Sequence, residues 1–189
     1  MKQIEGMLIS GIEDNFIESN EEDSFKIEVV LALSNVCNAY GLQRANNLGI
    51  PIQVLPSSQY TDRKIFDRDL VEILKPLKLD LCVLAGFMRI LTPIFTQNIR
   101  SINIHPSLLP LYKGAHGIVE SYASPMCFGG VSVHYVNEEL DSGEIIAQGV
   151  IAKIPKESLT SYETRIHKLE HLLYPLAILK ILTTNDDNY

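Results

Sequence analysis

Ser-Ile-Asn-Ile-His-Pro-Ser-Leu-Leu, residues 101–109, is the stretch from which the fold can be worked out. Two isoleucines alternate with Asn103 and His105, and this two-residue period predicts a short strand with the polar pair on one face. Pro106 lacks a backbone N–H, so the strand ends there and His105 lies at its carboxyl end. Open α/β sheets bind their ligands at that end of the strands. The alternative is a buried amide and a buried histidine bonded to backbone, but the pairing of the two favours a site.

Strand-like and helix-like patterns alternate on either side of this stretch. Residues 81–85 form a continuous apolar run that ends at Gly86, as in a central parallel strand covered on both faces. Further strands are expected at residues 7–11, 27–33, 52–55, 131–136 and 145–152. Helices are expected at residues 38–48, after an N-cap at Thr61 or Asp62, after Thr92-Pro93, and after a capping box of Thr160 and Glu163 whose apolar stripe is Ile166, Leu169, Leu173 and Leu176.

The order of these elements predicts an α/β fold of the Rossmann-like kind. We expect a mostly parallel sheet, antiparallel strands in the C-terminal part, and helices on both faces. The length predicts one domain over residues 1–189, divided into a Rossmann-like half at 1–100 and a second half at 101–189. Residues 11–15, Gly-Ile-Glu-Asp-Asn, lack the glycines of a dinucleotide loop, and no Walker-type loop is present. The fold alone therefore does not name the ligand.

Composition excludes several classes of function. A net charge of -7 argues against binding to nucleic acid or to an anionic membrane. The three cysteines, Cys37, Cys82 and Cys127, show no disulfide framework and no metal spacing, so we expect reduced thiols and no metal. No signal peptide and no membrane-spanning run are visible. The sequence predicts a cytoplasmic protein that acts on small molecules, as a monomer or a homodimer.

Three blocks of residues resemble a known family. Residues 83–91 read Val-Leu-Ala-Gly-Phe-Met-Arg-Ile-Leu, residues 103–110 read Asn-Ile-His-Pro-Ser-Leu-Leu-Pro, and residues 140–143 read Leu-Asp-Ser-Gly. In this order and spacing they are similar to the folate-dependent formyltransferases, above all to those that formylate glycinamide ribonucleotide in purine biosynthesis. The resemblance runs from about residue 34 to residue 182. It implies the formyltransferase version of the Rossmann-like fold, with a nucleotide or phosphate half at 1–100 and a catalytic and folate-binding half at 101–189.

The reaction that the resemblance implies needs two kinds of catalytic group. The amine of glycinamide ribonucleotide attacks the formyl carbon of 10-formyltetrahydrofolate, and the resulting tetrahedral oxyanion expels the folate nitrogen. Donors must face the developing negative oxygen, and the resemblance assigns this role to Asn103 and to protonated His105. A further group must carry a proton from the attacking amine to the leaving nitrogen, and the resemblance assigns this to Asp141, paired with His105.

The resemblance also assigns binding residues, each of which has a plainer structural explanation. The folate would be bound by Arg63, Met88, Arg89, Ile90, Leu91 and Asn103. Glycinamide ribonucleotide would be bound by Gly11, Asn15 and Glu170. His134 matches a histidine close to the catalytic group. Surface charge, core packing or a satisfied strand histidine would account for several of these side chains equally well, whereas an acid such as Glu170 beside an apolar helical stripe favours a function.

One loop departs from the family. In the family, the first loop normally reads Gly-Asn-Gly-Ser-Asn and binds the substrate phosphate through backbone amides at a helix N-terminus. Here only Gly11 and Asn15 remain, and the carboxylates of Glu13 and Asp14 would repel a phosphate dianion. Three readings therefore stay open: a glycinamide ribonucleotide formyltransferase with an altered loop, a formyltransferase or formyltetrahydrofolate hydrolase that uses another acceptor, and a non-catalytic folate-binding relative.

Overall fold

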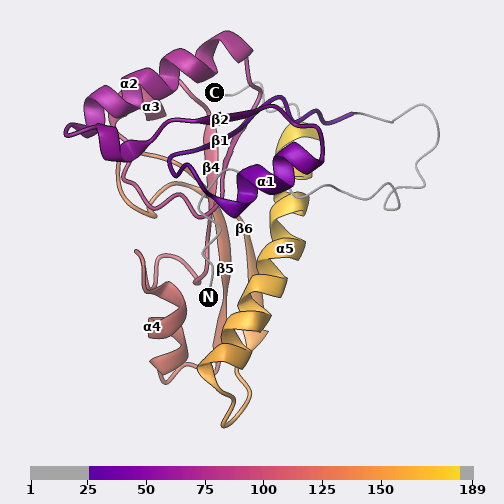
Figure 1. Ribbon diagram of the computed structural model, residues 1–189. Helices are drawn as coiled ribbons and strands as arrows, with labels where there is room; N and C mark the ends of the chain where they lie inside the picture. Colours follow the sequence, from indigo (N-terminus) through magenta and orange to yellow (C-terminus); the bar gives the residue numbers. More distant parts are fainter. Residues whose placement is uncertain (1–25, 184–189) are drawn as a thin grey trace.

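The structure is a computed structural model that describes residues 26–183. Two groups of strands lie at its centre, with helices on both sides (Figure 1). The strands are β1 (Ala32–Ser34), β2 (Ile52–Val54), β3 (Cys82–Leu84), β4 (Ser101–His105), β5 (Phe128–Tyr135) and β6 (Ile145–Ala152). The helices are α1 (Tyr40–Asn47), α2 (Arg63–Leu74), α3 (Pro93–Thr96), α4 (Gly117–Ala123) and α5 (Leu159–Thr183), with 3-10 turns at Ser57–Gln59 and Lys75–Leu77.

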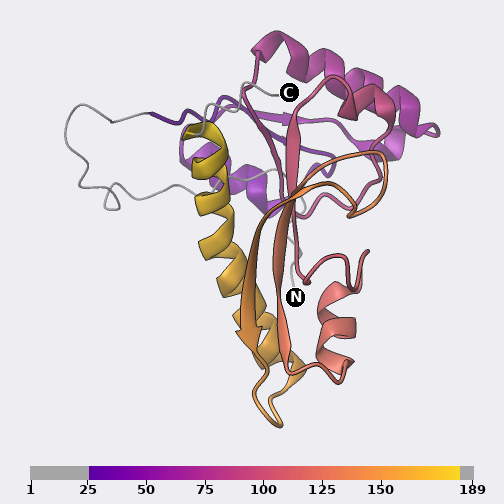
Figure 2. The same cartoon turned by 180° about the vertical axis from the view of Figure 1, so that it is seen from behind.

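Parallel pairing in the N-terminal part gives way to antiparallel pairing in the C-terminal part. β1 pairs with β2, and β3 with β4, in parallel. β4 pairs with β5, and β5 with β6, antiparallel, so the second sheet has the order β3-β4-β5-β6. Figures 1 and 2 show α1 and α5 on one side of the strands and α2, α3 and α4 on the other. The predicted α/β fold, with antiparallel strands near the C-terminus and helices on both faces, is confirmed.

The alternation along β3 explains the two main core clusters. Cys82 and Leu84 pack against α2, in a cluster that includes the fully buried Phe66. Val83 faces the other way and packs with Ile102 against the C-terminal half of α5. Successive side chains of a strand point to opposite faces, so one apolar run fills two cores. This is why residues 81–85 show no polar position.

Several expected boundaries moved. Residues 145–152 form a strand as predicted, and Asp62 caps α2 by accepting a hydrogen bond from the Lys64 amide at 2.8 Å. The strand expected at 27–33 is confined to β1, because within the described residues only 32–34 have ladder partners in β2. β5 begins earlier than expected and includes Gly129 and Gly130. β6 approaches so closely here that a Cβ at Gly130 would collide with the Gly149 carbonyl, so this strand position requires glycine. The strand expected at residues 7–11 lies outside the described residues.

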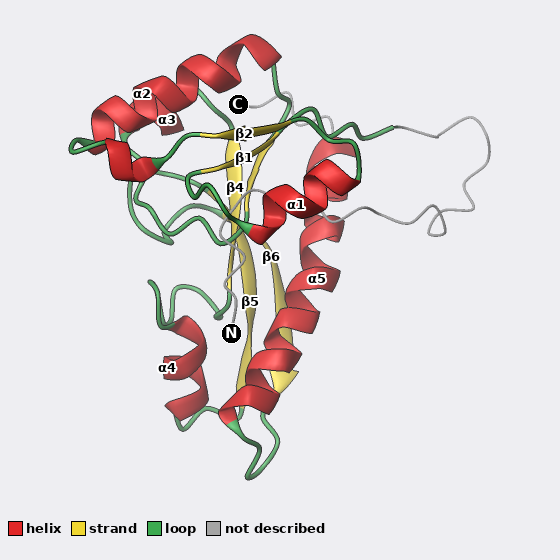
Figure 3. Cartoon of the chain, in the orientation of Figure 1, coloured by secondary structure: helices red, strands yellow, loops and turns green. Residues whose placement is uncertain are grey.

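The predicted start of the last helix was wrong, as was part of its buried stripe. α5 begins at Leu159, so Thr160 lies inside it, and the Ser158 hydroxyl accepts the Ser161 amide at 3.2 Å instead. Leu176 is 63% exposed, because beyond residue 173 other positions of α5 form its buried face. The buried residues there are Tyr174, Ala177, Ile178 and Ile181. Figure 3 shows α4, a helix that the sequence did not predict, after the loop that follows β4.

Candidate active site

The strand register brings Asn103, His105 and His134 together. Ile102 and Ile104 of β4 pack toward α5, so Asn103 and His105 lie on the opposite face of the sheet. In the antiparallel pair of β4 and β5, Asn103 is opposite His134 and His105 is opposite Ser132. Directly opposite residues lie within side-chain contact. One face of two adjacent strands therefore holds an amide and two imidazoles.

Asp141 reaches this group from the loop between β5 and β6. Its Oδ2 lies 3.4 Å from Nδ1 of His105, and its Oδ1 lies 3.7 Å from Nε2 of His134. The Gly114 amide donates to Oδ2 at 2.8 Å and ties this loop to the loop that follows β4. Asp141 has φ +48°, an uncommon left-handed conformation for a residue that is not glycine. Three titratable side chains, each about 5% exposed, thus share one buried cluster.

The two ring nitrogens of His105 have different partners. Nε2 lies 2.8 Å from the Tyr112 carbonyl oxygen, and since a carbonyl only accepts, Nε2 carries a hydrogen and donates it. Nδ1 then faces the Asp141 carboxylate, and the pair is attractive when the ring is protonated at both nitrogens. Gly117 at the start of α4 backs the ring, where a Cβ would lie 3.0 Å from Nε2. The ring is therefore confined on three sides.

His134 donates through Nδ1, whereas His105 donates through Nε2. Its Nδ1 donates to its neighbour's carbonyl, that of Tyr135, at 2.8 Å, so in the neutral ring Nε2 is an acceptor. Burial lowers the pKa of His134, outweighing the opposing effects of the Tyr135 carbonyl and Asp141. The Asn103 amide nitrogen lies 3.4 Å from this Nε2 and donates to it. Neutral His134 thereby orients the Asn103 carboxamide.

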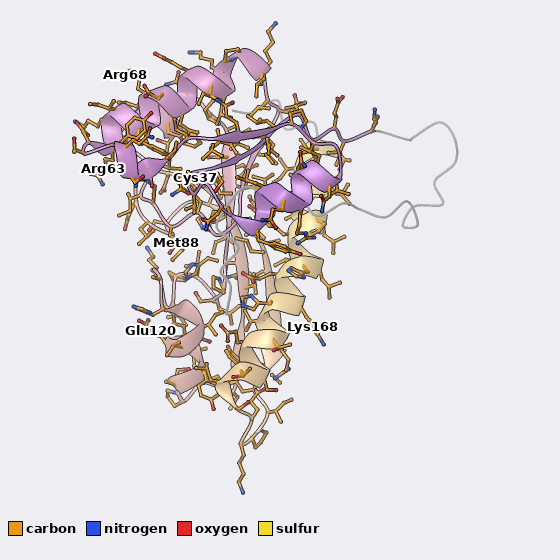
Figure 4. All side chains as sticks on the ribbon, viewed as in Figure 1. Cys37, Arg63, Arg68, Met88, Glu120 and Lys168 are labelled. Atoms are coloured by element: carbon orange, nitrogen blue, oxygen red, sulfur yellow. The ribbon has the colours of Figure 1, made fainter. Side chains whose placement is uncertain are left out.

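The residues predicted to bind folate follow β3, next to Asn103. Leu84, the last residue of β3, is the register partner of Asn103. Met88 and Ile90 are exposed, 57% and 47%, whereas Leu91 is in the core, so Leu91 can offer a ligand only its backbone. The Arg89 guanidinium lies over the Phe66 ring at 4.6 Å. Met88 is in the loop that joins β3 to α3, and Figure 4 shows it between α2 and α4, with Arg63 at the start of α2.

Glu170 lies on the α5 side of the same strand ends. Its Oε2 accepts a hydrogen bond from Nδ1 of His167 at 2.6 Å, and this bond raises the pKa of His167. One turn further on, the Tyr174 hydroxyl contacts the carbonyls of Leu84 and Ile102 at 2.6 and 3.1 Å. Burial first, and then charges that include Cys82 and Glu170, raise the pKa of Tyr174. Glu170 is therefore near the carboxyl ends of β3 and β4 but across the sheet from His105.

Gly11, Asn15 and the expected absence of a metal are the remaining site predictions. Gly11 and Asn15 lie outside the described residues. Within residues 26–183, no three His, Cys, Asp or Glu side chains are grouped so that they could hold a metal ion. Among the same residues no helix is both long and apolar enough to cross a membrane.

Known proteins match this chain over most of its length. Residues 7–178 match the family described as "Formyl transferase". Phosphoribosylglycinamide formyltransferase of Escherichia coli is 37% identical over 177 residues, which is 91% of this chain and 84% of that protein. A trifunctional purine biosynthetic protein of Drosophila melanogaster is 37% identical over 93% of this chain, and the chain spans 14% of that protein.

Solved structures agree with the sequence matches. Phosphoribosylglycinamide formyltransferase of Campylobacter jejuni superposes with a TM-score of 0.78 at 49% identity, covering 82% of this chain and 80% of that one. The enzyme of the same name from Bacillus halodurans gives a TM-score of 0.80 at 34% identity, covering 86% and 84%. The resemblance drawn from the three sequence blocks is confirmed, and this chain belongs to the formyl transferase family.

Proposed function

We propose that this chain transfers the formyl group of 10-formyltetrahydrofolate to the amine of glycinamide ribonucleotide, a step of purine biosynthesis. Relatives that carry the name of this activity match 91% of the chain. The observation that carries the proposal is the cluster of the partly buried Asn103 with the buried His105 and Asp141, in which His105 Nδ1 lies 3.4 Å from the Asp141 carboxylate. Attack of an amine on a formyl carbon needs a donor for the oxyanion and a group that moves a proton, and this cluster supplies both.

Asn103 is the donor that is ready for the oxyanion. Its amide nitrogen has two hydrogens, and one is directed to Nε2 of His134. The second has no partner among the described residues, so it is available to a negative oxygen that develops beside β4. Because neutral His134 already orients the amide, the donor does not have to reorganise during the reaction.

His105 needs a small rearrangement before it can donate as well. Its Nε2–H is bonded to the Tyr112 carbonyl, and its Nδ1 faces Asp141. We expect Nε2–H to exchange the Tyr112 carbonyl for the formyl oxygen when the donor binds. A charged imidazolium is a stronger donor than a neutral ring, and the Asp141 carboxylate stabilises that charge.

Asp141 has one oxygen left for proton transfer. Oδ2 accepts the Gly114 amide, whereas Oδ1 accepts no hydrogen bond from the described residues and lies 3.7 Å from Nε2 of His134. We propose that Oδ1 accepts the proton that the attacking amine loses and returns it to the folate nitrogen as that bond breaks. The bond to Gly114 holds the carboxylate in place throughout.

Binding of the two substrates is assigned to two sides of the strand ends. We propose that Arg63 and the Met88–Leu91 segment bind the folate, and that Glu170 binds the ribose hydroxyls. The assignment of Gly11 and Asn15 to the phosphate, the division at residues 100 and 101, the cytoplasmic location and the monomer or homodimer remain predictions. The proposal includes no metal and no macromolecular partner.

A steady-state assay on the purified chain tests the proposal. Formation of tetrahydrofolate is followed with glycinamide ribonucleotide, with an unrelated amine such as an amino sugar, and with no amine. We expect turnover only with glycinamide ribonucleotide, and a rate roughly 10²–10³-fold lower in Asn103→Ala. Equal folate release with and without amine would instead establish a hydrolase. Binding of tetrahydrofolate without turnover on any amine would establish a non-catalytic relative.

A further inference from the structure

The Met88–Leu91 segment has little structure of its own. It follows β3 and Gly86, which has φ +65°, and it is followed directly by Thr92, the residue before α3. Met88 and Ile90 are largely exposed. A segment that presents its backbone to a ligand must be fixed from outside, because no strand ladder or helix holds it.

A buried carboxylate on α2 provides one such fixation. Asp67 is 1% exposed, and its Oδ2 accepts the Thr92 backbone amide at 2.5 Å. No ion pair within residues 26–183 includes Asp67. Carboxylates are almost never fully buried unless a partner compensates their lost hydration. The partner found here is the backbone amide of Thr92, which directly follows the segment that we assign to the folate.

The neighbouring residue of α2 fixes the middle of the same segment. Phe66 is fully buried, and the Arg89 guanidinium lies 4.6 Å above its ring, in cation–π geometry. Tyr60 packs against the same ring in an edge-to-face arrangement, with 5.3 Å between centroids. Phe66 and Asp67, two consecutive residues of α2, therefore fix the segment at Arg89 and directly after its end, at Thr92.

The Thr92 side chain does not fix the segment itself. Thr92 is the N-cap residue of α3, but its hydroxyl makes no capping bond, and its buried Oγ1 has no hydrogen-bond partner among the described residues. Without Asp67 the Thr92 amide would be buried and unpaired, which is unfavourable. Relief of that cost would require the segment to move.

We infer that Asp67 is a positioning residue for the folate, which it serves by fixing the Thr92 end of the Met88–Leu91 segment. The inference rests on the proposed function, because it takes this segment as the folate-binding one. Asp67 touches neither substrate in this account. It acts through Thr92, and its effect is therefore expected on folate affinity and not on the chemical step.

Two substitutions and one matched control test the inference. Asp67→Leu keeps the branching at Cγ, with larger methyl groups in place of the two oxygens, and removes the acceptor, whereas Asp67→Asn keeps an acceptor oxygen and removes the charge. The control is Asp69→Asn, which changes a carboxylate on the same helix that accepts the Tyr60 hydroxyl at 2.6 Å. KM for both substrates and kcat are measured, together with the Kd of tetrahydrofolate by calorimetry, a readout that needs no turnover.

We expect Asp67→Leu to raise the folate KM and the tetrahydrofolate Kd about tenfold, with kcat and the KM of glycinamide ribonucleotide within about twofold. Asp67→Asn should restore most of the affinity, and Asp69→Asn should match the wild type. An unchanged Kd in Asp67→Leu would overturn the inference, as would a fall in kcat alone. If Asp67→Leu fails to fold, Asp67→Ala is measured in its place, because it also removes the acceptor, and an unchanged tetrahydrofolate Kd in that variant would overturn the inference.

The calorimetric readout separates this inference from the proposed function. A wild-type chain that binds tetrahydrofolate but formylates no amine refutes the acceptor assignment, and the Kd comparison still decides the role of Asp67. A wild-type chain that does not bind tetrahydrofolate refutes both.

Discussion

The candidate site has a strand-borne part and a loop-borne part, and they are held in different ways. Asn103, His105 and His134 lie on β4 and β5, where the antiparallel register sets their spacing. Asp141 and the Met88–Leu91 segment lie on loops. A carboxylate that accepts one backbone amide fixes each of them: Asp141 bonds Gly114 within the loops, and Asp67 of α2 bonds Thr92.

Precision in the two parts has different physical sources. A ladder distributes the positioning over many backbone hydrogen bonds, so the loss of one side chain leaves its neighbours in place. A loop depends on a few specific contacts, so the loss of one contact can move the whole segment. Side-chain deletion in the strands should therefore act on chemistry or stability, whereas small changes in the loops should act on position.

The largest effect is expected for Asp141→Asn. The amide keeps the shape of the side chain and can still accept the Gly114 amide, but it cannot take up a proton, so kcat should fall roughly 10²–10⁴-fold. Stopped-flow or steady-state rates measure this, and the melting temperature should change little. The control is Asp80→Asn at an exposed position. A rate within tenfold of the wild type would refute the proton-transfer role.

Gly143→Ala should misplace the same loop without touching a catalytic side chain. A Cβ at residue 143 would run into the Tyr135 carbonyl oxygen at the end of β5, so the loop that carries Asp141 must shift. A displacement of about 1 Å at a catalytic group can cost roughly 10²-fold in kcat. If the loop instead kept its place, kcat would equal that of the wild type, and the loop-borne part would be less sensitive than we infer.

Ser132→Ala tests the strand-borne part, and its effect should be on stability. The fully buried Ser132 hydroxyl accepts the Leu109 amide at 2.9 Å and donates to the Ser107 carbonyl at 2.7 Å. Its removal leaves a buried amide unpaired, so the free energy of unfolding should fall by about 1–3 kcal/mol, as measured by urea denaturation. Thr160→Ala, at an exposed position of α5, is the control and should stay within about 0.5 kcal/mol. Equal loss in both variants would contradict this account.

The smallest effect is expected at His167, where pH is the variable. The hydrogen bond to Glu170 raises the pKa of His167, so the folded state binds its proton more tightly than the unfolded state. The stabilisation should be complete below about pH 6.5 and disappear as the pH rises through the folded-state pKa. The His167 side chain is 48% exposed, so solvent screening keeps the contribution below about 1 kcal/mol. The difference in the free energy of unfolding between the wild type and His167→Gln should shrink with rising pH. A difference that grows with pH would refute the stabilising role of the bond to Glu170.

Prediction succeeded where the pattern was local. The alternation in residues 101–105 predicted that Asn103 and His105 share a face, and the apolar run at 81–85 predicted a strand buried on both sides, as β3 is. Helix α4, which the sequence did not predict, is short and has no capping side chain, so its only signal was the spacing of Ile118 and Tyr122. The capping box at Thr160 had the right residues in the wrong place, because Ser158 was available two residues earlier.

The sequence by itself determined the type of fold, the strand that carries the amide and the imidazole, and the family, because periodicity and motif order are properties of the chain. Only the tertiary structure decided that Asp141 meets both histidines, that the Tyr112 carbonyl occupies Nε2 of His105, and that Asp67 is buried against Thr92. Each of these contacts joins a loop to a strand or a helix, and two of them, His105 with Asp141 and Asp67 with Thr92, join segments at least 25 residues apart. Their geometry depends on how the elements pack against one another, and no local pattern encodes that packing.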